Sequence, residues 1–466
     1  MLFSSMTFVF MFLPIVCGMY LLVRNRQLRN YVLLFASILF YAWGEPKYVA
    51  IMLLTIIINY FGAILIDKHH RHKKQLLIWT ILADLGILFY FKYFNFVMKN
   101  INFAFNADIP FLDVIMPIGI SFYTFQALSY VIDVYRGDVA VQKRINKLAL
   151  YICLFPQLIA GPIVKYHDVK DQIDYREERF DKVIYGIKRF IIGLAKKMLI
   201  ANTMGAVADK IFAMPVTDFG TGIAWIGAIA YTFQIFYDFS GYSDMAIGLG
   251  SIFGFKFLEN FNYPYIAKSI TDFWRRWHIS LSTWFKEYLY IPLGGNRVAK
   301  SRMYLNLFLV FLATGIWHGA EWTFIVWGLW HGFFIIMEKL TGWHKKEGGT
   351  GLRISQHLYT ILVFVFGWVL FRADNIIYAW QYFKNMLGLV EHNNITYTLG
   401  YYIDNIEILT FAVAVLCSMP IFKNIALPVV NKYKHFAINT WIMMLFVLSS
   451  AAIAASTYNP FIYFRF

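Results

Sequence analysis

A histidine in the middle of an apolar stretch is the residue of this sequence best suited to chemistry. His318 follows Trp317 and is flanked by Gly315 and Gly319, which permit close approach of a backbone or a substrate. An imidazole in such a place can remain neutral near pH 7, take up a proton, and act as a general base or nucleophile. A hydrogen-bonded histidine of the core fits the same local features, and the residues alone leave both readings open.

A second histidine, His278, lies among tryptophans and arginines. In one continuous helix, Trp274, Trp277 and His278 would share a face. Arg275 and Arg276 would then turn partly away from it. This arrangement suits an anionic ligand that arrives from the cytosol, although an interfacial aromatic belt with arginines reaching toward water has the same pattern.

Two further places are weaker candidates. His331 repeats the Trp-His-Gly tripeptide of His318, at a spacing that would put the two side chains on roughly opposite faces of one unbroken helix. We interpret His331 as structural. Asn296 and Arg297 follow two glycines, which is typical of a turn with a cationic cap.

The run from Tyr237 to Asp244 is polar within an apolar segment. Its Asp and Ser side chains can bond to free backbone groups at a helix break, and its glycine permits such a break. Asp238 and Asp244 can instead orient a histidine or line a proton path, because ionisable groups within apolar segments are costly.

The composition places these residues in a membrane. Apolar residues make up 59% of the 466 residues and charged residues 15%, with 20% aromatic. Globular chains average about 25% charged residues. The net charge of +15 comes from Lys and Arg in short clusters between apolar runs, as retention on the cytosolic side requires, so nucleic acid is not an expected partner. No metal site or permanently bound cofactor is expected.

The first apolar stretch, Met1–Val23, lacks a preceding basic region and a small-residue cleavage site, so we predict a retained span. Positive charges follow it, which predicts an outside N-terminus. The basic loops Lys68–Lys74 and Arg136–Lys147 then fall in the cytosol, in agreement with this orientation and with an inner or plasma membrane location.

We expect about eleven crossings, several of them shorter than the roughly 20 residues that a standard bilayer requires. Besides the first, they are expected at 31–43, 48–66, 76–97, 114–134, 223–257, 304–316, 322–336, 358–371, 408–419 and 439–457. Such short spans suggest a thin centre.

Other segments depart from simple spans. Prolines and a glycine interrupt segment 148–164, which predicts a re-entrant segment, because broken backbone at membrane depth must be buried in protein or line a cavity. Segments 183–212 and 272–293 mix apolar with basic residues and are expected at the cytoplasmic rim.

The fold class is therefore an all-α polytopic membrane protein. We predict a single integral-membrane domain, 1–466, with N-terminal spans over 1–147, a catalytic core over 148–340 and C-terminal spans over 341–466.

Several segments, taken in their order along the chain, resemble the membrane-bound O-acyltransferases. They are Phe155–Pro162, Tyr237–Asp244, Asp272–Trp284, Tyr288–Arg297, Gly315–Gly319 and Tyr458–Phe464. The branch they resemble is that of bacterial alginate O-acetylation, with the transmembrane peptidoglycan and cellulose acetylation proteins. The likeness to the D-alanyl-teichoic-acid branch is weaker.

The resemblance implies His318 as the essential catalytic residue and His278 as a second active-site position. It implies a helical ring around a thin centre, pierced by a tunnel from the cytosolic side. It also implies that acetyl crosses the membrane and passes to a separate extracytoplasmic acetyltransferase, of the SGNH type, that modifies a polysaccharide.

The residues themselves fit this function. An acetyl thioester donor, either acetyl-coenzyme A or an acyl carrier, is large, anionic and cytosolic, so Arg275, Arg276 and Arg297 can attract its phosphates. The other candidate substrate-binding residues are Trp274, Trp277, Trp317, Asn296, Tyr237, Asp238 and Asp244. The alternatives are D-alanyl transfer to teichoic acid, a transporter or flippase of polysaccharide precursors, and a purely structural subunit of an export complex.

Overall fold

The computed structural model describes residues 1–392, 397–421, 434–456 and 458–462, and this part of the chain contains helices and no β-strand. The all-α expectation is thereby confirmed for the described residues. Packing divides the chain into two compact units. The first comprises Met1–Phe190 and Tyr242–Leu258, and the second comprises Ile191–Gly241 and Glu259–Phe466.

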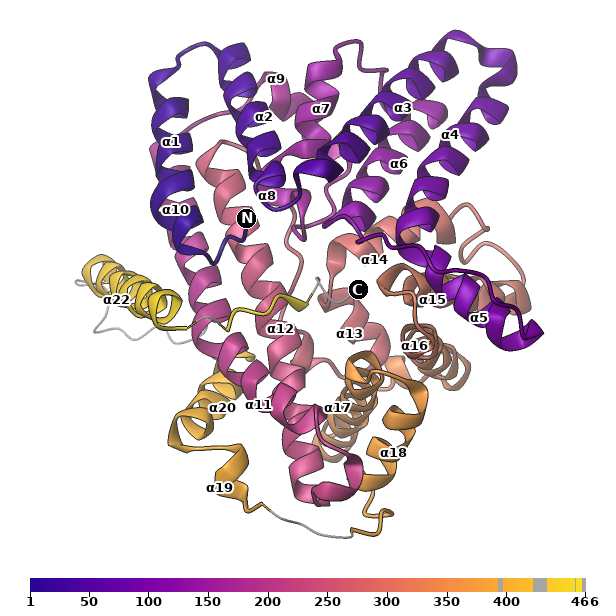
Figure 1. The fold of residues 1–466 in the computed structure, drawn as a ribbon, viewed down its shortest axis with the longest axis vertical. Coiled ribbons are helices and arrows are strands. Elements are labelled where there is room, and N and C mark those ends of the chain that lie inside the picture. Colours follow the sequence, from indigo (N-terminus) through magenta and orange to yellow (C-terminus); the bar gives the residue numbers. More distant parts are fainter. Residues whose placement is uncertain (393–396, 422–433, 457, 463–466) are drawn as a thin grey trace. The chain divides into compact units, whose positions relative to one another are not determined.

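The first unit is built on the N-terminal helices. They are α1 (Leu13–Leu22), α2 (Arg26–Ala42), α3 (Val49–Lys68), α4 (Lys73–Leu88), α5 (Phe94–Phe105), α6 (Ile120–Arg136), α7 (Ile145–Cys153), α8 (Phe155–Leu158) and α9 (Tyr166–Asp174). Helices α3, α4 and α6 pack against one another (Figure 1). Asp84 of α4 is buried in this packing and accepts hydrogen bonds from Nδ2 of Asn59 at 2.9 Å, which satisfies its carboxylate.

The interrupted segment 148–164 is broken as its prolines and glycine predict. Helix α7 ends at Cys153, the short α8 ends at Leu158, and the chain has no regular helix again until Tyr166. The side chains from Leu150 to Tyr166 are buried. Irregular backbone therefore lies within protein here, which is the condition for such backbone at membrane depth.

The second unit holds the residues of interest. Its helices are α11 (Asn202–Phe212), α13 (Ile270–Arg276), α14 (Ile279–Phe285), α15 (Lys300–His318), α16 (Trp322–Thr341), α17 (Thr350–Arg372), α18 (Ile376–Met386), α19 (Leu399–Tyr402), α20 (Asn405–Cys417) and α22 (Lys434–Ala455). Helices α10 (Phe180–Ala195) and α12 (Thr221–Ile252) contribute residues to both units. A π-helical turn, η5 (Lys196–Ala201), joins α10 to α11.

Six helices among the described residues are long and apolar enough to cross a membrane. They are Pro46–Lys68, His70–Phe105, Phe180–Phe212, Trp322–Thr341, Thr350–Arg372 and Phe436–Ala455, with shorter apolar helices at Phe8–Leu22 and Asn405–Cys417. The chain is thus a multi-span membrane protein, and the larger number of crossings expected from hydropathy remains a prediction.

The helix from Phe180 to Phe212, which we expect at the cytoplasmic rim, has the length and composition of a span, and its position in the membrane stays a prediction. One of its basic residues, Lys197, is buried, and its Nζ lies 2.7 Å from Oδ1 of Asp238. A lysine neutralised by a buried carboxylate does not have to reach water.

Helices α15 and α16 form an antiparallel hairpin whose backbones touch, beside α17 (Figure 1). A Cβ at Gly315 would lie 2.5 Å from the carbonyl oxygen of Phe324. A Cβ at Gly328 would lie 2.4 Å from that of Phe311. Glycines at a helix crossing let two backbones approach closely, so this pair determines how the two helices pack.

The crossing gives a stability prediction. Gly328→Ala pushes α15 and α16 apart and is expected to destabilise the protein by about 1–3 kcal/mol, because overpacking a tight contact costs that much. Thermal unfolding in detergent measures the loss. Gly351→Ala, at a helical glycine with open space around it, is the matched control and should leave the transition unchanged. Equal unfolding temperatures for the two variants would contradict the close crossing.

Candidate active site

The α15–α16 hairpin places His318 at the last residue of α15, inside the protein. The side chain is only 5% exposed. The chain then turns at Gly319, which is extended, and α16 begins at Trp322. A Cβ at Gly319 would collide with the ring of Phe324, so this position is limited to glycine by space.

Aromatic rings surround the imidazole of His318. The ring centroids of Trp317, Trp327 and Phe371 lie 4.9, 4.8 and 5.2 Å from it, each nearly perpendicular to the imidazole. Beside it is a small cavity, whose lining among the described residues also includes Ile235, Phe239, Trp277, Trp368 and Ile462. The histidine therefore faces a space from which water is largely excluded.

His278 occupies a turn and not the middle of a helix. Helix α13 ends at Arg276, α14 begins at Ile279, and His278 has a φ of 44°, in the left-handed region. The continuous helix in which Trp274, Trp277 and His278 would share a face is therefore not formed. Asn260 holds the break, because its backbone oxygen accepts a hydrogen bond from the N–H of Ile279 at 3.0 Å.

The same asparagine orients the imidazole. Oδ1 of Asn260 accepts hydrogen bonds from the backbone N–H and the hydroxyl of Ser280, at 3.1 and 2.9 Å. Because that oxygen is an acceptor, Nδ1 of His278, 3.2 Å away, is the donor. Burial lowers the pKa of His278 to about 3. The ring is then neutral and Nε2 carries a lone pair. The ring centroid of His278 lies 4.6 Å from that of Phe239, which lines the cavity at His318.

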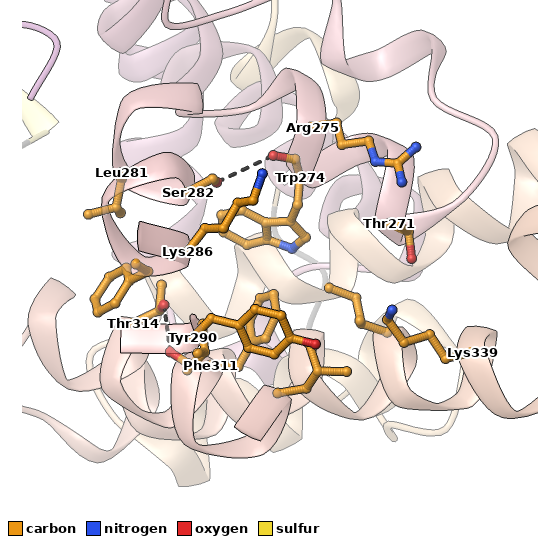
Figure 2. A pocket seen from close by; sticks show the side chains of 14 residues that line it. Thr271, Trp274, Arg275, Leu281, Ser282, Lys286, Tyr290, Phe311, Thr314 and Lys339 are labelled. Atoms are coloured by element: carbon orange, nitrogen blue, oxygen red, sulfur yellow. Dashed lines mark hydrogen bonds between the residues drawn. The ribbon is translucent and has the colours of Figure 1, made fainter. Parts of the chain in front are cut away.

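A larger pocket of about 250 Å³ opens between α13, α14, α15 and α16 (Figure 2). Its walls are mostly apolar, and three cations, Arg275, Lys286 and Lys339, line it without any carboxylate. Arg275 and Lys339 lie close enough for their like charges to repel. We call this space the cationic pocket. Such a lining suits a slender apolar group that carries negative charge at its outer end.

Two tryptophans separate the cationic pocket from the cavity at His318. Trp274 lines the pocket and its ring centroid lies 5.7 Å from that of Trp327. Trp327 lines the cavity on the other side. The two spaces are thus neighbours across one pair of indole rings.

A third pocket, of about 160 Å³, lies at the beginning of α16 and is partly polar. Glu321, Thr323, Arg372 and Asp374 line it, and it shares Phe371 with the cavity at His318. The cationic pocket reaches Lys339, near the other end of the same helix. Because α16 has 20 residues, its ends are about 30 Å apart. Pockets therefore reach the neighbourhood of His318 from both ends of a membrane-length helix.

Some predicted site residues lie elsewhere in this unit. Arg276 pairs with Asp272 at 3.0 Å and is not among the residues that line the cationic pocket. Asn296 and Arg297 are exposed. Oδ1 of Asn296 accepts a hydrogen bond of 2.6 Å from the hydroxyl of Tyr290, which does line the pocket.

The polar run of α12 does not interrupt the helix, so the predicted helix break is wrong. The helix continues through Gly241, where a Cβ would lie 2.8 Å from the carbonyl oxygen of Gly193. The glycine thus serves a close helix contact. The hydroxyl of Tyr237 donates to the carbonyl of Ala414 at 2.6 Å. Asp244 belongs to the first unit, where its carboxylate pairs with Arg189 at 2.6 Å.

Asp238 and a residue near the chain's end form a contact that sequence reasoning missed. Oδ2 of Asp238 accepts a hydrogen bond from the backbone N–H of Ile462 at 2.8 Å, and Ile462 lines the cavity at His318. The sequence feature that could have indicated this contact is the presence of opposite charges, Lys197 and Asp238, within apolar segments. The segment Tyr458–Phe464 is one of those that carry the family resemblance, and its residues Tyr463 and Phe464 lie outside the described residues.

His331 is buried among aromatic rings in the same region. Its ring centroid lies 5.3 Å from Trp274 and 5.2 Å from Trp327. A turn separates α15 from α16, so the unbroken helix that would put His318 and His331 on opposite faces does not exist. Both imidazoles contact Trp327, with ring centroids 4.8 Å away for His318 and 5.2 Å away for His331.

Comparison with known proteins identifies the family of this chain. The profile of the MBOAT, membrane-bound O-acyltransferase family matches residues 143–379, a range that contains both histidines. A protein named probable alginate O-acetylase AlgI from Pseudomonas putida is 41% identical over the whole of both chains. That of Pseudomonas aeruginosa is 44% identical over 83% of this chain and 75% of its own. The peptidoglycan O-acetyltransferase of Helicobacter pylori is 37% identical over 84% of this chain and 80% of its own.

The matched range covers half of the chain, and the identities extend over most of it. Together with a buried histidine between two pockets, they establish what the motifs indicated. The chain belongs to the membrane-bound O-acyltransferase family and is a membrane-bound O-acyltransferase.

Proposed function

We propose that this protein takes an acetyl group from a cytosolic thioester and passes it across the membrane for O-acetylation of an extracytoplasmic polysaccharide, alginate or a related polymer. His318 acts as the general base or as a transient acyl acceptor. The observation that carries the proposal is the position of His318 in a nearly dry aromatic cavity, with a cationic pocket on one side and a partly polar pocket on the other.

The cationic pocket is the proposed donor site. Its apolar walls suit the pantetheine arm of coenzyme A or of an acyl carrier, and Arg275, Lys286 and Lys339 suit the phosphates at its outer end. The thioester end would pass the indole rings of Trp274 and Trp327 to reach His318. We propose that this route is part of a tunnel that leads from the cytosolic side to His318. We also propose that the helices form a ring around a thin centre, through which the tunnel passes.

The chemistry follows from the surroundings of His318. The imidazole removes the proton of an acceptor hydroxyl while the hydroxyl oxygen attacks the thioester carbonyl carbon. The carbon–sulfur bond breaks and the proton passes to the departing thiolate. In the covalent alternative, an imidazole nitrogen attacks the thioester carbonyl carbon and the carbon–sulfur bond breaks, which releases the thiolate. The acceptor hydroxyl then attacks the acetyl carbon, the bond to the imidazole breaks, and the hydroxyl proton neutralises the thiolate. The carboxyl end of α15 favours the positively charged imidazole that forms in either route.

His278 is proposed to assist at the same place. Asn260 fixes its tautomer, so Nε2 presents a lone pair rather than a proton. A lone pair there can accept a hydrogen bond from a hydroxyl or amide of the substrate. The aromatic rings around both histidines exclude water, which protects the thioester from hydrolysis.

The orientation is proposed from charge. The end of α16 that carries Lys339 is followed by the basic residues 344–346, so it faces the cytosol, and the N-terminus lies outside. The pocket at Glu321 then faces outward. There an extracytoplasmic acetyltransferase of the SGNH type would collect the acetyl group, in an inner or plasma membrane.

The catalytic histidine can be tested directly. His318→Ala is expected to lower the rate of acetyl transfer from labelled acetyl-coenzyme A by about 10²–10⁴, the usual worth of general-base catalysis. The purified protein in nanodiscs, with a hydroxylated acceptor, provides the assay. His72→Ala, which alters an exposed loop histidine, is the matched control. A near-normal rate of acetyl transfer by a folded His318→Ala protein would contradict the proposal.

The donor pocket has its own test. Arg275→Ala with Lys339→Ala is expected to raise the KM for acetyl-coenzyme A at least tenfold, because one charge-assisted hydrogen bond is worth roughly 1.5–3 kcal/mol. KM should also rise less steeply with salt than in the unaltered protein, since fewer charges remain to be screened. Arg302→Ala removes an exposed cation of α15 that does not line the pocket. If it has the same effect, the pocket is not the donor site.

A further inference from the structure

The cavity beside His318 is small. Its volume is about 10 Å³, which is roughly the space that one water molecule needs. A methyl group is of similar size. The methyl of an acetyl group delivered to His318 would fill the cavity, whereas each further methylene would have to displace a wall. The walls therefore decide which acyl groups can be transferred.

Most of the side chains that line the cavity are aromatic rings held in place by one another. Trp277 and Trp368 pack with ring centroids 4.8 Å apart, and Trp327 and Phe371 with centroids 4.9 Å apart. Rings that hold one another in this way form a rigid frame, because a densely packed interior transmits any displacement to its neighbours. Among the described residues of the lining, the aliphatic side chains are Ile235 and Ile462.

The two isoleucines are held differently. Ile235 belongs to α12 and is 3% exposed. Ile462 lies beyond α22 in the sequence, and its backbone N–H donates to Asp238. Asp238 is in turn paired with Lys197, and Nζ of Lys197 also donates to the carbonyl of Pro460. A buried ion pair thus holds the segment 458–462 against the cavity.

Neighbouring contacts support the same segment. Nδ2 of Asn202 donates to the carbonyl of Tyr458 at 3.3 Å, and the hydroxyl of Tyr458 donates to Asp209 at 2.6 Å. The side chains of Lys197 and Asp238 are 3% and 1% exposed. A charged pair so deeply buried depends on exact hydrogen-bond geometry, so losing either partner should move the segment.

We infer that Ile235 and Ile462 limit the transferred acyl group to two carbons, and that Asp238 is a positioning residue that holds Ile462 in this wall. The inference rests on the proposed function. It names acyl-chain length as the property selected and assigns the selection to residues that do no chemistry.

The test compares acyl donors of increasing length. Acetyl-, propionyl- and butyryl-coenzyme A are given to the purified protein in nanodiscs, and release of free coenzyme A is measured with the hydroxylated acceptor of the His318 assay. Ile462→Ala and Ile235→Ala are expected to raise the ratio of butyryl to acetyl kcat/KM about tenfold or more, since a pocket discriminates by about that factor per methylene. The corresponding valine variants should give smaller increases.

The control is Ile211→Ala. Ile211 of α11 is fully buried and does not line the cavity, so this variant loosens the core to a similar extent without enlarging the acyl space. Its donor ratio should equal that of the unaltered protein. A change as large as that of Ile462→Ala would overturn the inference, because general loosening would then explain the effect.

Asp238→Asn tests the positioning role. The amide retains the shape of the carboxylate but leaves Lys197 without its counter-charge, so Ile462 should withdraw and the donor ratio should rise as in Ile462→Ala. Combining the two changes should add little, because they act on one wall. An unchanged ratio in a folded Asp238→Asn protein would refute this part.

The outcomes separate the inference from the function on which it rests. If the unaltered protein releases no coenzyme A from any donor, the proposed function fails. If it turns over acetyl-coenzyme A, while the alanine and valine variants at 235 and 462 all keep its donor ratio, the function stands and the inference fails. Should the alanine variants not fold, the valine variants carry the comparison.

Discussion

Direct backbone contact between α15 and α16, at Gly315 and Gly328, is the constraint on which the site depends. A larger side chain at either glycine would separate the helices, and the contact between His318 at the end of one and Trp327 on the other would be lost. The hydrophobic effect cannot drive helices together within lipid, so close packing and small residues have to do so. The geometry of the cavity follows from this crossing.

Charged side chains in the second unit differ in whether they have a partner of opposite charge. Two buried cations are paired with carboxylates, Lys197 with Asp238 and Arg372 with Asp209. The cations that line the cationic pocket have no carboxylate in its lining. A membrane protein tolerates buried charge when it has a partner. The two pairs therefore stabilise the packed structure, whereas the cations of the pocket are the basis of the donor site that we propose.

Tertiary contacts changed the meaning of several residues that composition had singled out. Asp238 looked like a substrate or proton-path residue, and in the structure it holds Ile462 beside His318. Helical periodicity did not predict the position of His278, because the side chain and backbone of Asn260 stabilise a left-handed turn there. Hydrogen bonds from residues distant in sequence override local helical preference, and no local pattern announces them.

The sequence by itself determined the membrane class, the all-helical fold of the described residues and the family, because these depend on composition, on apolar run lengths and on short ordered motifs. It also located the interruption of helical structure after α7, because prolines and glycine act on the local backbone. Only the tertiary structure decided that Trp274 and Trp327 divide two pockets and that the segment 458–462 closes the cavity. Those are contacts between residues far apart along the chain, where distance in sequence carries no information about distance in space.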